Sequence, residues 1–333
     1  MEVKRTIGMP RTAASGRRLG PVVAAFAACA WLAHTPVRAA DAPVTTPDRP
    51  VEIAGARQFE LQSKVTGRTY RIFVAPSPGA DPTKPAPVVY VLDGNGYFPI
   101  VVQAMRFWGG FDDGVQPAIV VGIGYPTDSV VERQARRVVE LTPTNPSADD
   151  PVVKYALPPD TAYGDVDGFL AMIERELKPL LAARYPVDPS NSVLMGHSLG
   201  GLAVVRALLT HPDSYRSYIA LSPAIWWDKG VVLKDEPAFL ARVRAHQFSG
   251  RLYLGVASYD EHMIDPPPAG MTSETVAQIV GATRTVTTTR AFARRVAEAG
   301  ARVEYDEFAD NTHLSVPWPA LRPALELALP ANP

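Results

Sequence analysis

The residues most able to do chemistry lie in the segment GHSLGG at residues 196–201, which contains the pattern G-x-S-x-G. An apolar run at 192–195 leads into the segment, and a helix-forming run at 199–210 follows it. This strand–turn–helix setting suits a nucleophilic serine, because the glycines allow a strained turn that raises the hydroxyl above a sheet. Ser198 is therefore the predicted nucleophile.

A serine hydroxyl at neutral pH needs a base within hydrogen-bond reach. Of the six histidines, His313 follows the last predicted strand, and in folds with this nucleophile turn the chain order is Ser, acid, His. His313 is the predicted base, with His262 as the alternative. The side chain of His197 is expected to point away from the Ser198 hydroxyl. The others lie in the leader or in helices: His34, His211 and His246.

The third member of the set should be a carboxylate that holds the imidazole in the right tautomer. Asp260 follows the predicted strand 252–256 and is the first choice, with Glu261 and Asp228 as alternatives and a Ser–His pair alone as another. The cluster of Asp260, Glu261, His262 and Asp265 has no helical i, i+4 histidine pair, so no metal is expected there.

A tetrahedral intermediate carries negative charge and needs two fixed hydrogen-bond donors. The backbone N–H of Leu199, directly after the nucleophile, is one candidate. The second donor is expected in the loop after an earlier strand, at residues 93–96, with the N–H of Asn95 preferred to that of Gly94.

The elements that must position these residues form an α/β pattern. Non-alternating apolar runs at 87–92, 118–123, 192–195, 218–221, 252–256 and 302–308 predict strands buried on both faces. Helical stretches are predicted at 97–107, 165–184, 199–210, 237–246, 285–299 and 319–327. The alternation predicts a mostly parallel, doubly wound sheet. Residues 57–64 and 70–75 predict an N-terminal antiparallel hairpin. The proline-rich segment 140–163 predicts a loop beside the site.

The first 39 residues predict a secretory signal peptide, with basic residues, an apolar run at 21–33 and the cleavage pattern Val37-Arg38-Ala39. A membrane anchor and a lipoprotein modified at Cys29 are the alternatives. Residues 40–50 predict a flexible leader, and residues 51–330 the folded domain. Cleavage would remove six basic residues and one acidic residue, and so change the formal net charge from −1 to −6. It would also remove the only cysteine, which excludes a cysteine nucleophile.

Composition narrows the function classes further. The chain has 333 residues, 33 basic and 34 acidic, with no long basic run, which argues against nucleic-acid binding. The predicted partner is a small-molecule ester. The mature chain, after signal cleavage, is predicted to have no membrane span. No feature of the sequence specifies an oligomeric state.

Several segments resemble the esterase D family of α/β-hydrolases, which includes S-formylglutathione hydrolases, feruloyl esterases, mycolyltransferases and enterochelin-type siderophore esterases. The resemblance extends from about Val51 to Leu327. The segments are VVYVLDGNGYF, VVGIGYP, LKPLLAARYPVDP, GHSLGGL, LSPAIWWD and FADNTHLSV. The first and fifth are similar to the branch that cleaves catecholate siderophore lactones, as is RVVELTP at 137–143, where that branch usually has Arg-x-x-Asp.

The resemblance implies an α/β-hydrolase fold, a triad of Ser198, Asp260 and His313, and oxyanion donors at Asn95 and Leu199. One departure is that the branch usually has Gly and then Glu around the acid, where this chain has Ala257-Ser258-Tyr259-Asp260. Tyr97, Trp227, Trp226 and Trp108 are candidates for an aromatic pocket. Arg133, Arg136 and Arg137 form a basic cluster suited to an anionic ferric catecholate, with a solvated helix face as the alternative. Arg137, Trp227 and Tyr97 are the predicted substrate-binding residues.

The sequence thus predicts a secreted or periplasmic serine ester hydrolase that acts through an acyl-enzyme and needs no metal or organic cofactor. A siderophore lactone is the substrate that the resemblance favours. The alternatives are an acyltransferase of the mycolyltransferase type, a generic esterase such as a feruloyl esterase or S-formylglutathione hydrolase, and a binding protein without activity.

Overall fold

A computed structural model describes residues 47–109, 114–146, 163–262, 267 and 270–331. Val51–Pro333 forms one compact unit. The predicted signal peptide at 1–39 and most of the predicted leader at 40–50 lie outside the described residues. None of the helices in the described ranges is long and apolar enough to cross a membrane.

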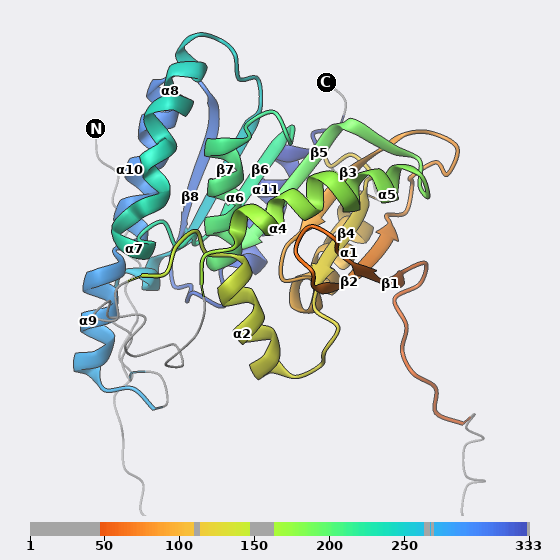
Figure 1. The fold of residues 1–333 in the computed structure, drawn as a ribbon, viewed down its shortest axis with the longest axis horizontal. Helices are drawn as coiled ribbons and strands as arrows, with labels where there is room; N and C mark the ends of the chain where they lie inside the picture. The colour runs from red at the N-terminus through yellow and green to blue at the C-terminus, as the bar shows by residue number, and fades with distance from the viewer. Residues whose placement is uncertain (1–46, 110–113, 147–162, 263–266, 268–269, 332–333) are drawn as a thin grey trace, which may run out of the picture. The chain divides into compact units, whose positions relative to one another are not determined.

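The core of this unit is an eight-stranded sheet in the order β1-β2-β4-β3-β5-β6-β7-β8 (Figure 1). β1 and β2 pair antiparallel, as do β2 and β4, and the remaining neighbours pair parallel. This arrangement confirms the predicted hairpin and the mostly parallel sheet. The strands are β1 (Arg57–Gln62), β2 (Thr69–Pro76), β3 (Ala86–Val91), β4 (Ile119–Gly124), β5 (Val187–His197), β6 (Ser217–Leu221), β7 (Arg251–Ala257) and β8 (Arg302–Phe308).

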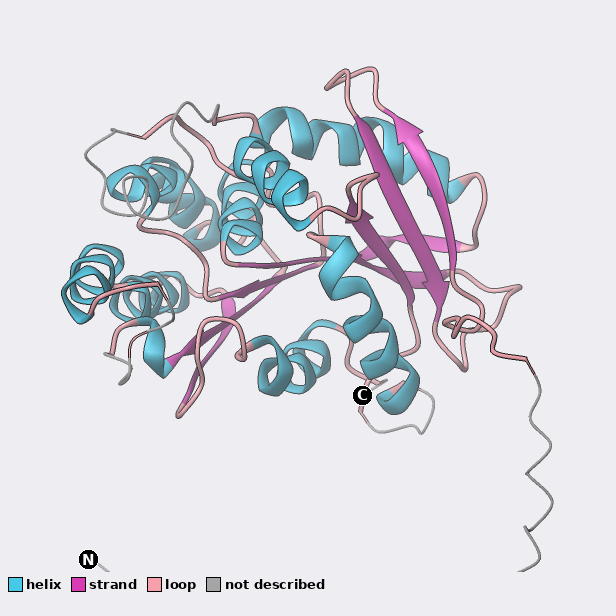
Figure 2. Ribbon diagram, turned by 90° about the horizontal axis from the view of Figure 1, so that it is seen from below, coloured by secondary structure: helices cyan, strands magenta, loops and turns pink. Residues whose placement is uncertain are grey.

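Helices cover both faces of the sheet, as the edge-on view in Figure 2 shows. In β3, Val88 and Tyr90 face one core cluster and Val89 and Val91 face the other. Both faces of the strand are therefore buried, which explains its unbroken apolar run. α1 (Gly94–Trp108) and α11 (Pro317–Ala328) pack on one side, and α4 (Val166–Met172), α6 (Leu199–Thr210), α8 (Glu236–Arg244) and α10 (Thr285–Glu298) on the other.

Some helices differ from the prediction. The predicted helix 165–184 is α4 followed by a π-helical turn at Ile173–Leu177 and then α5 (Lys178–Ala182). α2 (Val130–Glu140) and α9 (Ser273–Thr283) were not predicted, nor were the short α7 (Trp227–Gly230) and the 3-10 turns Val231–Asp235 and Ser258–Asp260. Of the predicted loop 140–163, residues 147–162 lie outside the described part of the chain.

α2 was missed although its sequence carries helix signals: Ser129 and Glu132 have the spacing of a capping box, and the apolar residues Val131, Ala135, Val138 and Val139 recur on one helix face. It begins at Ser129, whose hydroxyl accepts a hydrogen bond from the Glu132 N–H at 3.3 Å. Only Val138 and Glu140 of the helix are buried, whereas Val130 and Val131 are 69% and 77% exposed. The helix therefore lies at the surface, beside the loops that carry the candidate site.

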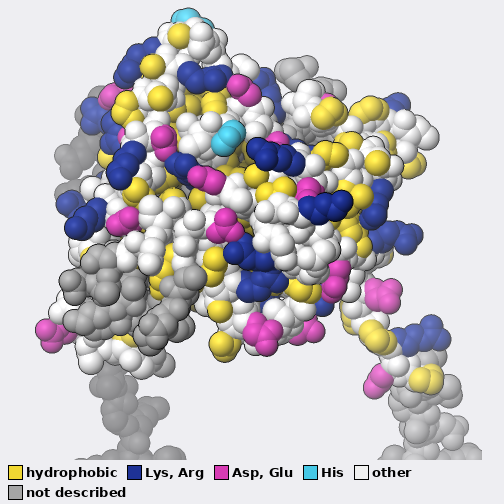
Figure 3. Space-filling view, viewed as in Figure 1, with side chains coloured by type: hydrophobic (Ala, Val, Ile, Leu, Met, Phe, Trp, Pro, Cys, Tyr) yellow, Lys and Arg dark blue, Asp and Glu magenta, His cyan; other side chains and the backbone are white. Residues whose placement is uncertain are grey.

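Charge on the face of the molecule seen in Figure 1 is mixed rather than separated. On the face seen in Figure 1, basic and acidic side chains are interspersed (Figure 3). A surface of this kind offers no extended field of one sign to attract a polyanion.

Candidate active site

Ser198 occupies the sharp turn between β5, which ends at His197, and α6, which begins at Leu199. Its backbone has φ 59° and ψ −117°, a region that residues with side chains rarely adopt. A Cβ atom at Gly196 would lie 2.3 Å from the Gly200 carbonyl oxygen, so the turn closes only with glycine there. The turn is held by a 2.9 Å hydrogen bond from the Ser198 N–H to the Leu221 carbonyl at the end of β6.

His313 and Asp260 lie side by side in the loops after β8 and β7. The His313 Nδ1 and Asp260 Oδ1 atoms are 2.7 Å apart, and the Asp260 side chain is only 3% exposed. Asp260 Oδ2 also accepts hydrogen bonds from the Ser222 hydroxyl and from the Ala257 N–H. An ionised carboxylate only accepts hydrogen bonds, so the His313 proton lies on Nδ1 and leaves Nε2 free to accept one.

The alternative acids and the alternative base have other partners. The Glu261 carboxylate accepts hydrogen bonds from the N–H and the hydroxyl of Thr287, in the first turn of α10. Asp228 accepts one from the Thr144 hydroxyl at 2.7 Å. His262 Nδ1 is 2.7 Å from the Ser258 carbonyl oxygen. The structure therefore brings Asp260 to His313, and holds the other candidates elsewhere.

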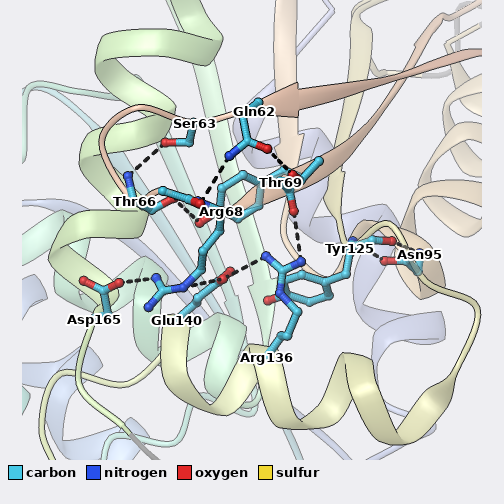
Figure 4. Close-up of polar contacts among 12 residues, drawn as sticks. Gln62, Ser63, Thr66, Arg68, Thr69, Asn95, Tyr125, Arg136, Glu140 and Asp165 are labelled. Carbon is cyan, nitrogen blue, oxygen red and sulfur yellow. Dashed lines mark hydrogen bonds and ion pairs between the residues drawn. The ribbon is translucent and has the colours of Figure 1, made fainter.

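The loop expected to supply the second oxyanion donor is fixed by the side chain of Asn95. Its Nδ2 donates to the Tyr125 carbonyl at 3.0 Å, and its Oδ1 accepts from the Tyr125 N–H at 2.7 Å (Figure 4). A Cβ atom at Gly124 would lie 2.4 Å from Asn95 Oδ1, so glycine is required at the end of β4. The N–H groups of Asn95 and Leu199 both lie in first helical turns, where N–H groups have no acceptor within their own helix.

A second clamp on the same loop is an ion pair that sequence reasoning missed. Arg137 of α2 donates from Nε to Asp93 Oδ1 and from Nη2 to Asp93 Oδ2, both at 2.9 Å. The two side chains are 15% and 13% exposed. Burial alone would lower the pKa of Arg137, but the adjacent Asp93 carboxylate more than offsets this and raises it. Asp93 precedes α1 with φ 53°, so the pair fixes a strained residue at the start of the loop predicted to supply the second oxyanion donor.

Ser198 and His313 line one cavity of about 530 Å³. Asn95, Tyr97, Arg133 and Arg137 line it too, so the structure brings most of the predicted site residues together. The rim includes three apolar side chains that are unusually exposed. These are Val130, Leu314 and Trp318, at 69%, 77% and 60% exposure. Trp318, in the first turn of α11, was not predicted.

The prediction that Trp227 binds substrate was wrong. Trp227 is 1% exposed, its indole N–H donates to the Thr144 carbonyl at 3.2 Å, and its ring packs against Tyr163. It belongs to the core because α7 turns its side chain inward. Trp226 and Trp108 also pack against the core and do not line the cavity.

The three arginines of α2 have three different environments. Arg137 is paired with Asp93, and Arg136 is paired with Glu140 at 3.1 Å and stacks over the Tyr125 and Tyr70 rings (Figure 4). Arg133 donates to the Asp128 carbonyl oxygen at 2.8 Å. In the described ranges no carboxylate lies within ion-pairing distance of it. Among the residues that the structure describes, Arg133 therefore brings a positive charge to the cavity without a carboxylate partner.

The family model described as "Putative esterase" matches residues 63–325. The chain belongs to this esterase family. Ferri-bacillibactin esterase BesA of Bacillus subtilis is 31% identical over 288 residues, which cover 83% of this chain and 90% of that protein. The siderophore triacetylfusarinine C esterase of Aspergillus fumigatus is 34% identical over 219 residues, which cover 64% of this chain and 71% of that protein. These findings confirm the family resemblance seen in the sequence.

A solved structure agrees with the sequence matches. Siderophore hydrolase EstA of Aspergillus nidulans superposes with a TM-score of 0.71 at 25% identity, over 85% of this chain and 97% of that one. The α/β-hydrolase fold is therefore confirmed. In the described part of the chain, no group of three or more His, Cys, Asp or Glu residues is placed to hold a metal ion.

The Asp93–Arg137 pair predicts a stability effect. Arg137→Gln leaves the Asp93 carboxylate partly buried without its partner, and should lower the free energy of unfolding by about 3 kcal/mol. It should also lower kcat for neutral and charged esters alike, because the oxyanion loop loses a clamp. Urea unfolding measures the first effect. Arg133→Gln, on the same helix, is the matched control and should change stability by less than about 0.5 kcal/mol. Equal losses for the two variants would contradict this account.

Proposed function

We propose that this protein is a serine esterase in which Ser198 is the nucleophile, His313 the general base and Asp260 the acid that orients it. The observation that carries the proposal is the 2.7 Å contact between His313 and a buried Asp260 at the cavity that Ser198 also lines. The membership of the chain in an esterase family supports the same chemistry.

In the first half-reaction, His313 Nε2 takes the proton of the Ser198 hydroxyl as its oxygen attacks the ester carbonyl carbon. The carbonyl oxygen becomes an oxyanion that accepts hydrogen bonds from the N–H groups of Asn95 and Leu199. Collapse of this intermediate breaks the ester C–O bond, and His313 gives its proton to the leaving alcohol. Water then attacks the acyl-Ser198 with the same base, and releases the acid and the free serine.

The substrate that best fits the cavity is the ester of an anionic, aromatic iron chelator. Arg133 supplies a positive charge that has no carboxylate partner in the described part of the chain, and the exposed Trp318 offers a flat apolar face for an aromatic ring. The relatives named above are siderophore esterases, one of them a ferri-bacillibactin esterase. A ferric catecholate lactone joins both properties in one ligand. Export with cleavage after Ala39 would bring the enzyme, at a net charge of −6, to such a ligand outside the cytoplasm, so local positive charge must offset the repulsion.

Ser198→Ala should abolish turnover while the fold persists, since the change removes one hydroxyl. Loss of a triad nucleophile leaves only the catalysis of the oxyanion donors, and lowers kcat by about 10⁶-fold. Hydrolysis of a short p-nitrophenyl ester measures this, with the thermal unfolding midpoint as the control for folding. Activity above a few per cent of wild type would remove Ser198 from its assigned role.

Asp260→Asn should lower kcat by up to about 10⁴-fold, because an amide at this position favours the wrong tautomer of His313. Glu261→Gln and Asp228→Asn are the matched controls. Each should stay within about tenfold of wild type, equivalent to about 1.4 kcal/mol in the barrier. A crippled Glu261→Gln beside an active Asp260→Asn would show that the acid is misassigned, and full activity in all three would indicate a Ser198–His313 dyad.

Arg133→Gln should raise KM for a ferric catecholate lactone by about tenfold and leave KM for a neutral short ester within about twofold, because only the first substrate carries charge. Arg294→Gln is the control, since Arg294 is an exposed residue of α10 that does not line the cavity. Equal KM changes for both esters would contradict an anionic substrate.

The alternative function, acyl transfer, is tested separately. Product analysis with an added alcohol acceptor separates hydrolysis from acyl transfer.

A further inference from the structure

His197, the residue before the nucleophile, is buried and has a hydrogen bond on each ring nitrogen. Its Nδ1 lies 2.8 Å from the Tyr97 hydroxyl oxygen, and its Nε2 lies 2.8 Å from the backbone carbonyl oxygen of His313. The rings of His197 and His313 lie against each other, with centroids 4.6 Å apart. His197 is 4% exposed. This chain of contacts takes no part in the proton transfers described above.

The two partners determine the tautomer of His197. A carbonyl oxygen only accepts hydrogen bonds, so the proton lies on Nε2 and points to His313. Nδ1 is then the acceptor, and the Tyr97 hydroxyl donates to it. The pKa of His197 is lowered well below its usual value, because burial disfavours the charged ring and the neighbouring His313 and Arg137 add to this. The ring is therefore a neutral donor with both nitrogens occupied.

We propose that His197 is a positioning residue, which ties the backbone of the catalytic base to the strand end that carries the nucleophile. The proposal rests on the assignment of His313 as the base under the proposed function. His313 lies in the connection between Phe308, where β8 ends, and Pro317, where α11 begins, and its side chain is 42% exposed. Such a connection needs anchors to hold a side chain in place.

The other anchors of this connection lie on either side of His313. The Thr312 N–H donates to the Ser315 hydroxyl at 2.9 Å within the connection itself, and the Asn311 carbonyl accepts from the Tyr259 N–H at 3.1 Å. The His197 contact differs because it binds the backbone of His313 directly. It also comes from the residue adjacent to Ser198, so the distance between base and nucleophile is set across a single side chain.

A neutral tether has an electrostatic advantage at this position. His313 becomes positively charged each time it takes the Ser198 proton. A cationic side chain in the place of His197 would oppose that charge at close range. The neutral imidazole donates its hydrogen bond without doing so. Tyr97, which fixes its orientation, belongs to α1 two residues after Asn95, so the chain of contacts joins the oxyanion helix, the nucleophile turn and the base loop.

Three variants of His197 test the tether. Gln can place an N–H near the position of the imidazole Nε2, whereas Asn is too short to reach the His313 carbonyl and Leu has no donor. Leu and Asn should lower kcat by about 10- to 100-fold through displacement of the base, with KM changed by less than about threefold. Gln should restore kcat to within about fivefold of wild type. Tyr97→Phe should lower kcat by a smaller factor, because His197 then loses only its orienting partner.

Separate outcomes decide the proposal and the function on which it rests. His313→Ala, assayed in parallel, should be inactive, and an active variant would overturn the base assignment itself. If His313→Ala is inactive but His197→Leu keeps half or more of wild-type kcat, only the tether is wrong. Equal kcat for the Gln and Asn variants would also overturn the tether. Only the Gln side chain is long enough to donate to the His313 carbonyl, so a tether requires the two variants to differ. This last comparison decides the matter even if the Leu variant fails to fold.

Discussion

The hydrogen bond between His313 Nδ1 and the buried carboxylate of Asp260 is the contact that the remaining parts of the site are arranged around. The Asp260 side chain is 3% exposed, and its hydrogen-bond donors come from the carboxyl ends of three strands: the Ser222 hydroxyl after β6, the Ala257 N–H at the end of β7 and the His313 ring after β8. β6, β7 and β8 are neighbours in the sheet, so their carboxyl ends meet at one edge. The parallel sheet thereby brings residues far apart in the sequence to one carboxylate.

The other side of the site depends on α2. Its three arginines have different surroundings: Arg137 holds Asp93 at the start of the loop 93–96, Arg136 pairs with Glu140 and covers the Tyr125 ring, and Arg133 lines the cavity with no carboxylate partner among the described residues. Side chains of one type on one helix therefore differ in their partners, and the role that we propose for Arg133 follows from that difference. The Arg137–Asp93 pair holds the start of the loop at 93–96, whereas Arg136 is paired within its own helix.

Much of the fold and of the candidate site was predictable from the sequence, because both follow from local patterns. Buried parallel strands gave unbroken apolar runs, and the turn around Ser198 needs glycines at fixed spacing. The choice of His313 needed only strand order. What the sequence could not give were contacts between distant residues: the Asp93–Arg137 pair, the hydrogen bond from Ser222 to Asp260, and the His197 link to the His313 carbonyl. Trp227 was misplaced for the same reason, since an aromatic residue near a site looks the same in sequence whether it faces the cavity or the core.

Covalent trapping of the nucleophile is the decisive experiment on the roles of Ser198 and His313. The full chain is treated with a fluorophosphonate, which reacts with serines activated by an adjacent base, and the modified residue is identified by peptide mass spectrometry. We expect one adduct per chain, on Ser198, that forms much more slowly in the His313→Ala variant because the base that activates the hydroxyl is gone. An adduct on another residue, or labelling of Ser198 at an unchanged rate without His313, would contradict these roles.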